Sequence, residues 1–569
     1  MRLYASVIFQ NNVMRLLIFL FFFLSCAGVS VQAQSKAVKN GMRSVVSILT
    51  YKDGALKGSG SGFFVGANGD MLASSTLFAG ADSAVAIDSD GKVCHVRHIV
   101  GVDDMFDCVK VRAVGKKIRP LLPSGAEAKA GDELYMLSYG VKKSGKAEPV
   151  KVLSVDSVYS LAYYTLDRPV QESSLSLPLV NAAGELVAVM QPSSLSDTLR
   201  SYAVSAGVAS SLLSSAKNYG RGYYRGMGIR TALPDEKGDA LSCLYIQPMM
   251  GDSLSWLNAI NDFIEMFPKS HEGYQSLAEY TAVYYRDMAT AEKAWNKALS
   301  LAGNKAEVHF GKGKVLNSIV QSGDSVSHGM LSLANALAYV DKAIAIEPLP
   351  LYISYKADML YGMQRYSEAA ECYGTLAATE MRSPELFSKI SQCHVSMKDY
   401  VKGVEMLDSA VGCFRQGARD AAPYILTRAL VKVSAGKFRD AVVDFNSYEQ
   451  LAGGLLSAEF YYMREQAELN ARMYQQALND IETAIDLAPG NLLYYIEKGM
   501  LCYRVKLTDE GLRTMEKAAG MAPDLADIHY LIGRLHMQKG DRESALASLE
   551  KARSLGHPDA EVQINSLGN

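Results

Sequence analysis

Several features that define common protein classes are missing from this sequence. Its eight cysteines are scattered and form no CxxC pair, which argues against zinc or thioredoxin-type chemistry, so we expect no metal and no cofactor. The formal net charge is only −2, and no run of basic residues offsets it, so we expect no nucleic-acid partner. The apolar run at residues 16–24 is only nine residues long, which is too short to cross a bilayer.

The overall composition is that of a folded protein with more than one domain. At 569 residues the chain is too long for a single hydrophobic core, and two or three domains are expected. Apolar residues make up 49% and charged residues 21%, which is typical of globular domains and not of disordered chains. Two local patterns, a β-rich front region and a periodic back region, indicate where the domains lie.

The first 33 residues are predicted to be a signal peptide. A basic start at residues 14–15 precedes the apolar run, and small residues follow it up to a signal-peptidase site, with cleavage after Ala33. An alternative is a loose lipobox that ends at Cys26, which would place a lipid anchor there and attach the protein to a membrane. A start at Met1 and a start at Met14 are both compatible with this pattern. Either way we expect export to the periplasm or cell envelope.

Removal of this segment leaves seven cysteines. Cys94 and Cys108 lie on what we expect to be neighbouring strands, so one alternative is a disulfide between them and the other is a pair of buried free thiols. Several other cysteines lie on apolar helix faces, where a cysteine packs as a small hydrophobic residue.

The back of the chain is periodic in its small residues. Ala477, Gly511 and Ala545 lie 34 residues apart, and each is followed by a large apolar residue four positions later and a small one seven positions later. Small residues at this spacing let two antiparallel helices touch closely, and Pro489 and Pro523 end the second helix of their units. The same position recurs upstream, at intervals of 33 to 45 residues, at Ala441, Gly403, Ala369, Ala336 and Ala291.

This pattern resembles the tetratricopeptide repeat (TPR), a helix pair of about 34 residues that stacks into a superhelix. The resemblance implies an all-α array of about nine helix pairs over residues 237–569, with a polar insertion at residues 318–332. It also implies a concave groove that binds proteins or peptides. The groove lacks the Lys/Arg stripe of a carboxylate-clamp repeat, so acidic chain ends are not the expected ligand. The residues placed in this groove, about half of which we expect to pack against neighbouring repeats instead, are Glu459, Tyr462, Gln466, Ile496, Met500, Tyr530 and Arg534.

Residues 38–215 have a different pattern, with short β-prone runs separated by Gly, Asp, Asn and Ser. Strands spaced this closely predict an all-β barrel or sandwich. The runs are residues 45–50, 62–65, 83–87, 93–100, 109–111, 133–138, 150–153 and 185–190.

The order of landmarks in this region is more specific. Gly60-Ser61-Gly62-Phe63 comes first, followed by Ser74-Ser75-Thr76-Leu77 and by Asp103-Asp104-Met105-Phe106-Asp107. Pro178-Leu179-Val180-Asn181 and Gly184-Glu185-Leu186-Val187 come last. The series resembles the trypsin-like serine protease domain of the HtrA type, which carries GSGF, TNxHV, DxxxDLAVL and GNSGGPLxN in the same order. The resemblance implies an all-β double barrel for the front domain.

The catalytic triad of that family is broken in this chain. The histidine position falls on Thr76 and the aspartate position on Asp107. The nucleophile position, three before Pro178, falls on Leu175. Threonine cannot accept a proton near neutral pH, and leucine cannot attack a carbonyl. The glycines that shape the oxyanion turn are also missing, since residues 173–178 read Ser-Ser-Leu-Ser-Leu-Pro.

We therefore expect a pseudoenzyme that has no catalytic residues and in which Asp107 is a hydrogen-bonded structural residue. The leading hypothesis is an exported scaffold or adaptor for proteins or peptides of the cell envelope, with a linker at residues 216–236 between barrel and array. One alternative is an active serine endopeptidase with an unorthodox nucleophile, whose repeats recruit substrate. Another is a component of a complex for outer-membrane assembly or polysaccharide uptake, in which the barrel is a spacer. The sequence leaves open the partner, the oligomeric state and whether the cleft still holds peptide.

Overall fold

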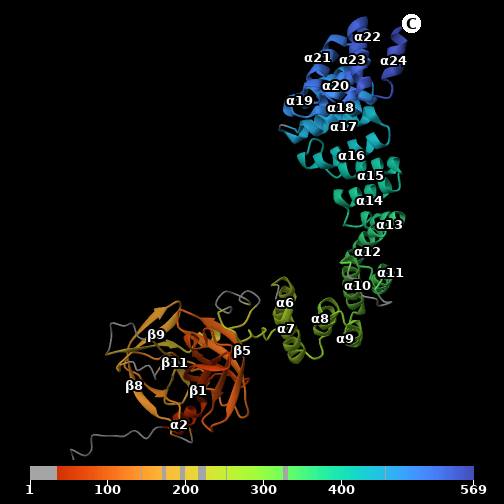
Figure 1. Ribbon diagram of the computed structural model, residues 1–569. Coiled ribbons are helices and arrows are strands. Elements are labelled where there is room, and N and C mark those ends of the chain that lie inside the picture. The colour runs from red at the N-terminus through yellow and green to blue at the C-terminus, as the bar shows by residue number, and fades with distance from the viewer. Residues whose placement is uncertain are drawn as a thin grey trace, which may run out of the picture. The chain divides into compact units, whose positions relative to one another are not determined.

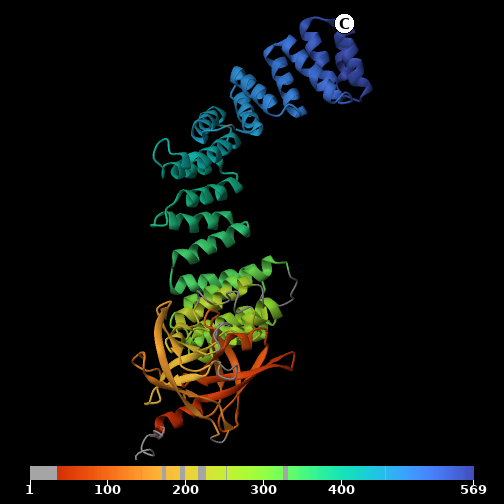
Figure 2. The ribbon, with the colours of Figure 1, turned by 90° about the vertical axis from the view of Figure 1, so that its left-hand side faces the viewer.

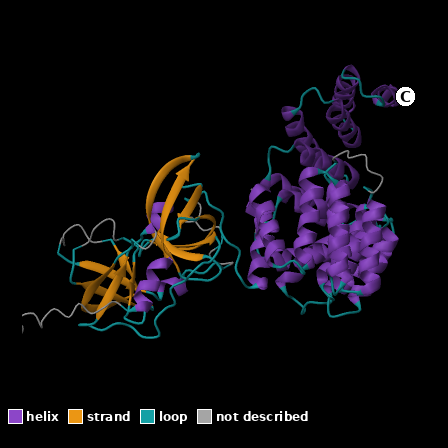
Figure 3. Ribbon diagram, turned by 90° about the horizontal axis from the view of Figure 1, so that it is seen from below, coloured by secondary structure: helices purple, strands orange, loops and turns teal. Residues whose placement is uncertain are grey.

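The structure is a computed structural model that describes residues 35–141, 144–169, 175–192, 199–215, 219, 226–250, 253–323, 331–454 and 456–568. The chain divides into two compact units, Met1–Leu301 and Ala302–Asn569. The described strands all belong to the first unit, and helices make up the second (Figure 3). The predicted signal segment, with Cys26 and Ala33, lies outside the described residues.

The strands of the first unit close into two antiparallel six-stranded barrels (Figure 1). The first barrel has the strand order β1-β2-β3-β6-β5-β4, and the second has the order β10-β11-β12-β9-β8-β7. The strands are β1 (Val45–Lys52), β2 (Ala55–Phe64), β3 (Asp70–Ser74), β4 (Ser83–Ile87), β5 (Val93–Asp103), β6 (Cys108–Val114), β7 (Glu133–Leu137), β8 (Ala147–Val158), β9 (Leu161–Leu166), β10 (Pro178–Val180), β11 (Leu186–Gln191) and β12 (Ser201–Ser205). Short helices accompany them at α2 (Lys36–Gly41), η1 (Met42–Ser44), α3 (Ser75–Phe78) and α4 (Val208–Ser211).

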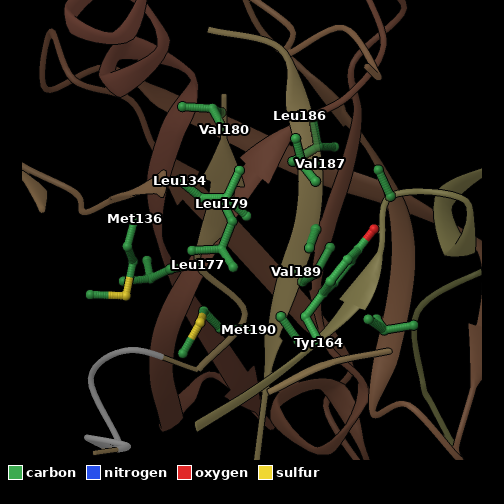
Figure 4. Close-up of a cluster of buried hydrophobic side chains, with 14 of the residues drawn as sticks. Leu134, Met136, Tyr164, Leu177, Leu179, Val180, Leu186, Val187, Val189 and Met190 are labelled. Carbon is green, nitrogen blue, oxygen red and sulfur yellow. The ribbon is translucent and has the colours of Figure 1, made fainter. Parts of the chain in front are cut away.

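Two hydrophobic clusters fill the barrels. Successive side chains of a strand point to opposite faces, so neighbouring residues of one strand can belong to different clusters. Val46 and Phe64 belong to the cluster of the first barrel. Val45 and Phe63, one residue earlier on the same strands, belong to the cluster that fills the second barrel. Figure 4 shows part of that second cluster. The first barrel therefore contributes to both clusters, and the boundary between the barrels is packed.

Four helices follow the barrels within the first unit. Trp256, Ile260 and Phe263 of the second helix form a buried cluster with Tyr280 of the third. This second helix also bonds to the first barrel, since His98 Nε2 of β5 lies 2.9 Å from Asp262 Oδ2. The helices are α6 (Lys237–Ile246), α7 (Ser253–Met266), α8 (His271–Tyr280) and α9 (Met288–Leu301), with a 3-10 turn η4 (Gln247–Met250) and a π-helical turn η5 (Thr281–Tyr285).

The expected linker at residues 216–236 is in part attached to the first barrel. Ile99 of β5 exchanges two backbone hydrogen bonds of 2.7 Å with residues 226–233 of this segment. Met227 and Ile229 are buried in the core of the first barrel. Residues 226–233 of the expected linker are therefore anchored to the first barrel, through pairing with a strand that is distant in sequence. Residues 216–218 and 220–225 lie outside the described residues.

The second unit consists of consecutive helix pairs stacked in chain order, as Figure 2 shows. Its described residues form seven pairs and a last single helix. Helix α10 takes in residues 318–321 of the expected polar insertion, and residues 324–330 lie outside the described residues. The helices are α10 (Lys305–Gln321), α11 (Leu333–Ile346), α12 (Pro350–Gly362), α13 (Tyr366–Ala377), α14 (Pro384–Ser396), α15 (Tyr400–Val411), η6 (Arg419–Ala421), α16 (Ala422–Ser434), α17 (Phe438–Ala452), α18 (Ala458–Asn470), α19 (Tyr474–Leu487), α20 (Leu492–Val505), α21 (Thr508–Met521), α22 (Ala526–Lys539), α23 (Arg542–Ser554) and α24 (Ala560–Gly568).

The periodic small residues all lie on the second helix of a pair, and all are buried. A Cβ atom added at Gly533 of α22 would lie 2.7 Å from Leu549 Cγ of α23. One added at Gly511 of α21 would lie 3.1 Å from Cys502 Cβ of α20, the first helix of its pair, and 2.8 Å from Leu535 Cδ2 of α22 in the next pair. These distances are shorter than van der Waals contact, so a larger residue would force the helices apart. The prediction that small residues let the paired helices touch is confirmed.

The seven cysteines in the described part of the chain are free thiols. Cys94 of β5 belongs to the core of the first barrel, whereas Cys108 of β6 belongs to the cluster of the second. The two thiols therefore point into different cores, and the disulfide alternative is wrong. In the described residues, no helix combines the length and apolar character needed to cross a membrane.

Candidate functional site

Asp107, the residue at the aspartate position of the triad, is held by four hydrogen bonds at the start of β6. Its carboxylate accepts from the hydroxyls of Ser74 and Ser75. It also accepts from the backbone N–H of Thr76 at 2.8 Å and from the Thr76 hydroxyl at 2.9 Å. Both carboxylate oxygens are engaged, so this network ties the start of α3 to the strand pair β3–β6.

Thr76 and Leu175, at the histidine and nucleophile positions, line the same cavity of about 630 Å³. The structure thus brings the three triad positions together, since Thr76 bonds directly to Asp107. The rest of the described lining is mainly small and hydroxyl-bearing, and comprises Ser47, Lys57, Gly58, Ser59, Gly60, Ser61, Ser74, Leu77 and Ser176.

The side chains that line this cavity limit the reactions that it could support. Thr76 uses its hydroxyl as a donor to Asp107, and Leu175 offers only hydrocarbon. No histidine is present among the described residues that line the cavity. His98, on β5, is bonded to Asp262 of α7 instead. The described lining therefore lacks the serine–histidine pair that the family's mechanism uses.

The chain after Leu175 keeps one feature of the family's turn and loses another. Ser176 has a φ of 59°, a left-handed conformation that favours glycine, which the family has at this position. Its backbone N–H donates to the carbonyl of Met190 at 3.1 Å. Leu177 is 3% exposed and packs in the cluster of the second barrel, with Leu179 and Met190 (Figure 4). Residues 173 and 174 lie outside the described residues.

The predicted groove residues lie on three first helices of the second unit, α18, α20 and α22. Met500 is 44% exposed. Glu459 is exposed as well, and Ile496 is half-buried. These are the positions at which the side chains are most open to a partner.

The other predicted groove residues contact neighbouring side chains. The Tyr462 ring lies 5.3 Å from that of Tyr494, and Gln466 Nε2 donates to Glu465 Oε2 at 2.8 Å. Tyr530 stacks on His557, with ring centroids 3.9 Å apart. Arg534 donates to the hydroxyls of Tyr530 and Tyr503. These four residues help to hold the repeats together, so a change at one of them would affect packing as well as binding.

Sequence reasoning missed a row of cations at one position of the first helices. Arg464 bonds to Asp480 on the second helix of its own pair and to Glu449 on that of the preceding pair. Lys498 bonds in the same way to Glu510 and Glu482, at 2.7 Å each. Arg428 repeats the arrangement with Asp444 and Asp408. The signal was available, because these cations lie 36 and 34 residues apart in the sequence.

Comparisons with known proteins gave similarity only to solved structures. No family model matches the chain, and no curated protein matches it. The active form of the Rv3671c protease from M. tuberculosis is 18% identical, with a TM-score of 0.28 over 32% of this chain and 85% of that chain. HtrA-type protease AlgW with a tripeptide is 19% identical, with a TM-score of 0.27 over 31% of this chain and 60% of that chain.

A third solved structure is helical. YrrB, described as a TPR protein with an unusual peptide-binding site, is 18% identical, with a TM-score of 0.29 over 35% of this chain and 99% of that chain. At such identities these likenesses concern the fold alone. The expected fold class is confirmed by the two closed six-stranded barrels and by the helix pairs with buried small residues. The chain therefore joins two closed six-stranded antiparallel barrels to an array of stacked helix pairs, the fold expected for a trypsin-like double barrel followed by a TPR-type array.

Proposed function

We propose that this protein is an exported, catalytically inactive scaffold that binds protein or peptide segments through its helical array. The observation that carries the proposal is the hydrogen bond between Thr76 and Asp107, with Leu175 lining the same cavity. The residue at the base position is thereby a donor to the aspartate, and the residue at the nucleophile position is apolar. Peptide hydrolysis by the family's mechanism needs the opposite properties at both positions.

The first helices of the array support the binding role. Stacked repeats present an extended surface to a partner. Large apolar side chains remain exposed on these helices, at Leu430 of α16 (40%) and at Leu493 (45%) and Met500 (44%) of α20. An exposed apolar patch is typical of an interaction site, and we propose that these side chains contribute to one. We therefore propose that the partner contributes apolar side chains, within a segment of a cell-envelope protein.

A serine-reactive fluorophosphonate probe tests the inactive barrel. We expect no labelling of the folded full chain under conditions that label trypsin completely. Ser176 is the matched control site, because it lines the cavity next to the nucleophile position. Labelling of the wild type that disappears in Ser176→Ala would identify an unorthodox nucleophile and overturn the inactive assignment.

A library of extended peptides tests the binding surface. Met500→Glu should reduce peptide capture by the full chain about tenfold, because it puts a charge on the proposed surface. Met521→Glu is the control, since Met521 is 41% exposed but lies on the second helix α21. Both variants should keep the melting temperature of the wild type.

Two outcomes would contradict the assignment to the array. One is equal capture by both methionine variants. The other is loss of capture only when the barrel cavity is blocked, as in Leu175→Trp. The second outcome would move the binding site to the cleft, where Ser47 and Ser61 line the space beside Leu175.

A further inference from the structure

Among the first helices from α12 to α22, Glu465 of α18 occupies a position that small residues fill in all the others. It lies twelve residues before Ala477, as Gly499 lies twelve before Gly511 and Gly533 twelve before Ala545. Its side chain is nonetheless fully buried, at 0% exposure. A carboxyl group therefore stands where helices approach one another closely. The residues at the equivalent positions of the other first helices from α12 to α22 are Ala357, Ser391, Ala429, Gly499 and Gly533.

A second buried carboxyl lies one helical turn further along α18. Glu468 is 3% exposed. Glu465 Oε2 accepts a hydrogen bond from Gln466 at 2.8 Å. The other oxygen of Glu465, Oε1, and the Oε2 atom of Glu468 are buried and have no hydrogen-bond partner among the described residues. Buried polar atoms are normally paired, so two unpaired carboxyl oxygens in one helix need an explanation.

The groups around this pair do not neutralise it. The one buried cation nearby, Arg464, is already engaged by Asp480 and Glu449. Burial raises the pKa of Glu465 to about 7 and that of Glu468 to about 8. The charged and titratable groups that interact with the pair come from all the helices packed on α18, and are Glu449 of α17, Tyr462 and Arg464 of α18, Asp480 of α19, and Glu497 and Arg504 of α20.

We propose that Glu465 and Glu468 form a proton-dependent joint in the array, packed when both carboxyls are neutral and loosened when both are ionised. A protonated carboxyl can stay buried at low cost, whereas two buried carboxylates one helical turn apart repel each other and must regain water. The way to regain water is for α18 to move away from α19 and α20. This inference goes beyond the proposed function, because it holds whatever the array binds.

The direction of the pH dependence follows from the raised pKa values. The stabilising contribution of each carboxyl is complete below its ordinary pKa, near 4.3. It is lost as the pH rises through about 7 for Glu465 and about 8 for Glu468. The array should therefore loosen between pH 6 and pH 9, and not on acidification over that range.

Hydrogen exchange of the full chain at pH 6 and pH 9, corrected for intrinsic exchange rates, tests the joint. In the wild type, protection of α18 and α19 should fall about tenfold or more at the higher pH, because a shift of one pKa unit is a tenfold change in equilibrium. Peptides of α22 and α23 serve as the internal reference. The double variant Glu465→Gln and Glu468→Gln should remove the fall, because neither amide ionises.

Two more variants separate the effect of the buried carboxyls from misfolding of the amide variant and from the loss of any carboxylate. Glu465→Ala introduces the residue found at Ala357 and Ala429, so it should fold even if the amide variant does not, and it should reduce the pH effect by about a third in logarithmic terms. Glu516→Gln, a change at an exposed site on α21, should leave the wild-type pH dependence unchanged. An equal loss of protection in the wild type, the double variant and Glu465→Ala would overturn the proposal.

Discussion

In the helical array, the residues that carry the architecture recur at one position of every second helix, whereas in the barrels each structural residue occurs once. Ala477, Gly511 and Ala545 are all buried, and a Cβ added at Gly511 would lie 3.1 Å from Cys502 Cβ of the paired helix. The barrels instead rest on alternating strand residues, such as Val45 and Val46, which face different clusters. The family's reactive positions contribute little to that packing.

This difference explains how the barrels can accept other residues at the family's reactive positions and keep their fold. Thr76 is exposed and its hydroxyl bonds only at the edge of the barrel, so a histidine there is not needed for the core. Leu177, by contrast, packs in the core, at a position where the family has glycine. A barrel can therefore replace reactive groups with groups that pack or bond. The array has less of this freedom, because the feature that recurs along it is a small side chain at a close helix contact.

The largest expected effect is on the close contact between α22 and α23. Gly533→Ala should destabilise the array by about 1–3 kcal/mol, because the new methyl would lie 2.7 Å from Leu549 Cγ. Gly520→Ala, on the neighbouring α21, is the control, since an added Cβ there meets nothing within 4 Å. This control should instead gain up to about 1 kcal/mol from helix propensity. Calorimetric unfolding of the full chain measures both, and equal effects would show that the contact is not tight.

The next effect concerns the network that replaces the triad in the barrel. Asp107→Asn should cost about 1–2 kcal/mol of barrel stability, because an amide provides one acceptor oxygen where four donors converge. Asp104→Asn, at an exposed position of the same turn, is the control and should change stability very little. Calorimetry again provides the measurement. A neutral Asp107→Asn would mean that the network does not contribute to the fold.

The parts of the fold that could be predicted from the sequence are those that leave a repeated or ordered signal. The array was found because a packing requirement recurs with each repeat, from Ala291 to Ala545. The double barrel was found because landmarks of a known family appear in order. The attachment of residues 226–233 was missed, since extended pairing with Ile99 of β5 involves no local pattern.

The candidate sites were less predictable, because their contacts join distant residues. The sequence places Thr76 and Asp107 at family positions, but not the hydrogen bonds that Ser74 and Ser75 add. Strand spacing suggested a pair for Cys94 and Cys108, yet it could not tell which face of the barrel each thiol occupies. The repeat spacing shows that Glu465 stands at a position where neighbouring repeats have a small residue. It does not show that the Glu465 side chain is fully buried.

The smallest expected effect is the one on catalysis when the triad residues are restored. The double variant Thr76→His and Leu175→Ser should show no cleavage of casein. Asp107 already accepts from Ser74 and Ser75, so both of its oxygens remain engaged when a histidine is introduced. An oxyanion hole needs backbone N–H groups that converge on the developing charge, and residues 173–177 lack the glycines that shape it.

A fluorogenic casein assay over a full day, with trypsin as the reference, measures this outcome. Calorimetry of the same sample has to show a folded barrel, so that inactivity is not the result of unfolding. The single variant Leu175→Ser provides the second control, since it adds a hydroxyl without a base. Cleavage by the double variant that is absent from Leu175→Ser would show that the turn still supports an oxyanion. The barrel would then differ from an active protease only at Thr76 and Leu175. The buried side chain of Leu177 would not prevent the turn from stabilising an oxyanion, so the difference between barrels and array would be smaller than this packing indicates.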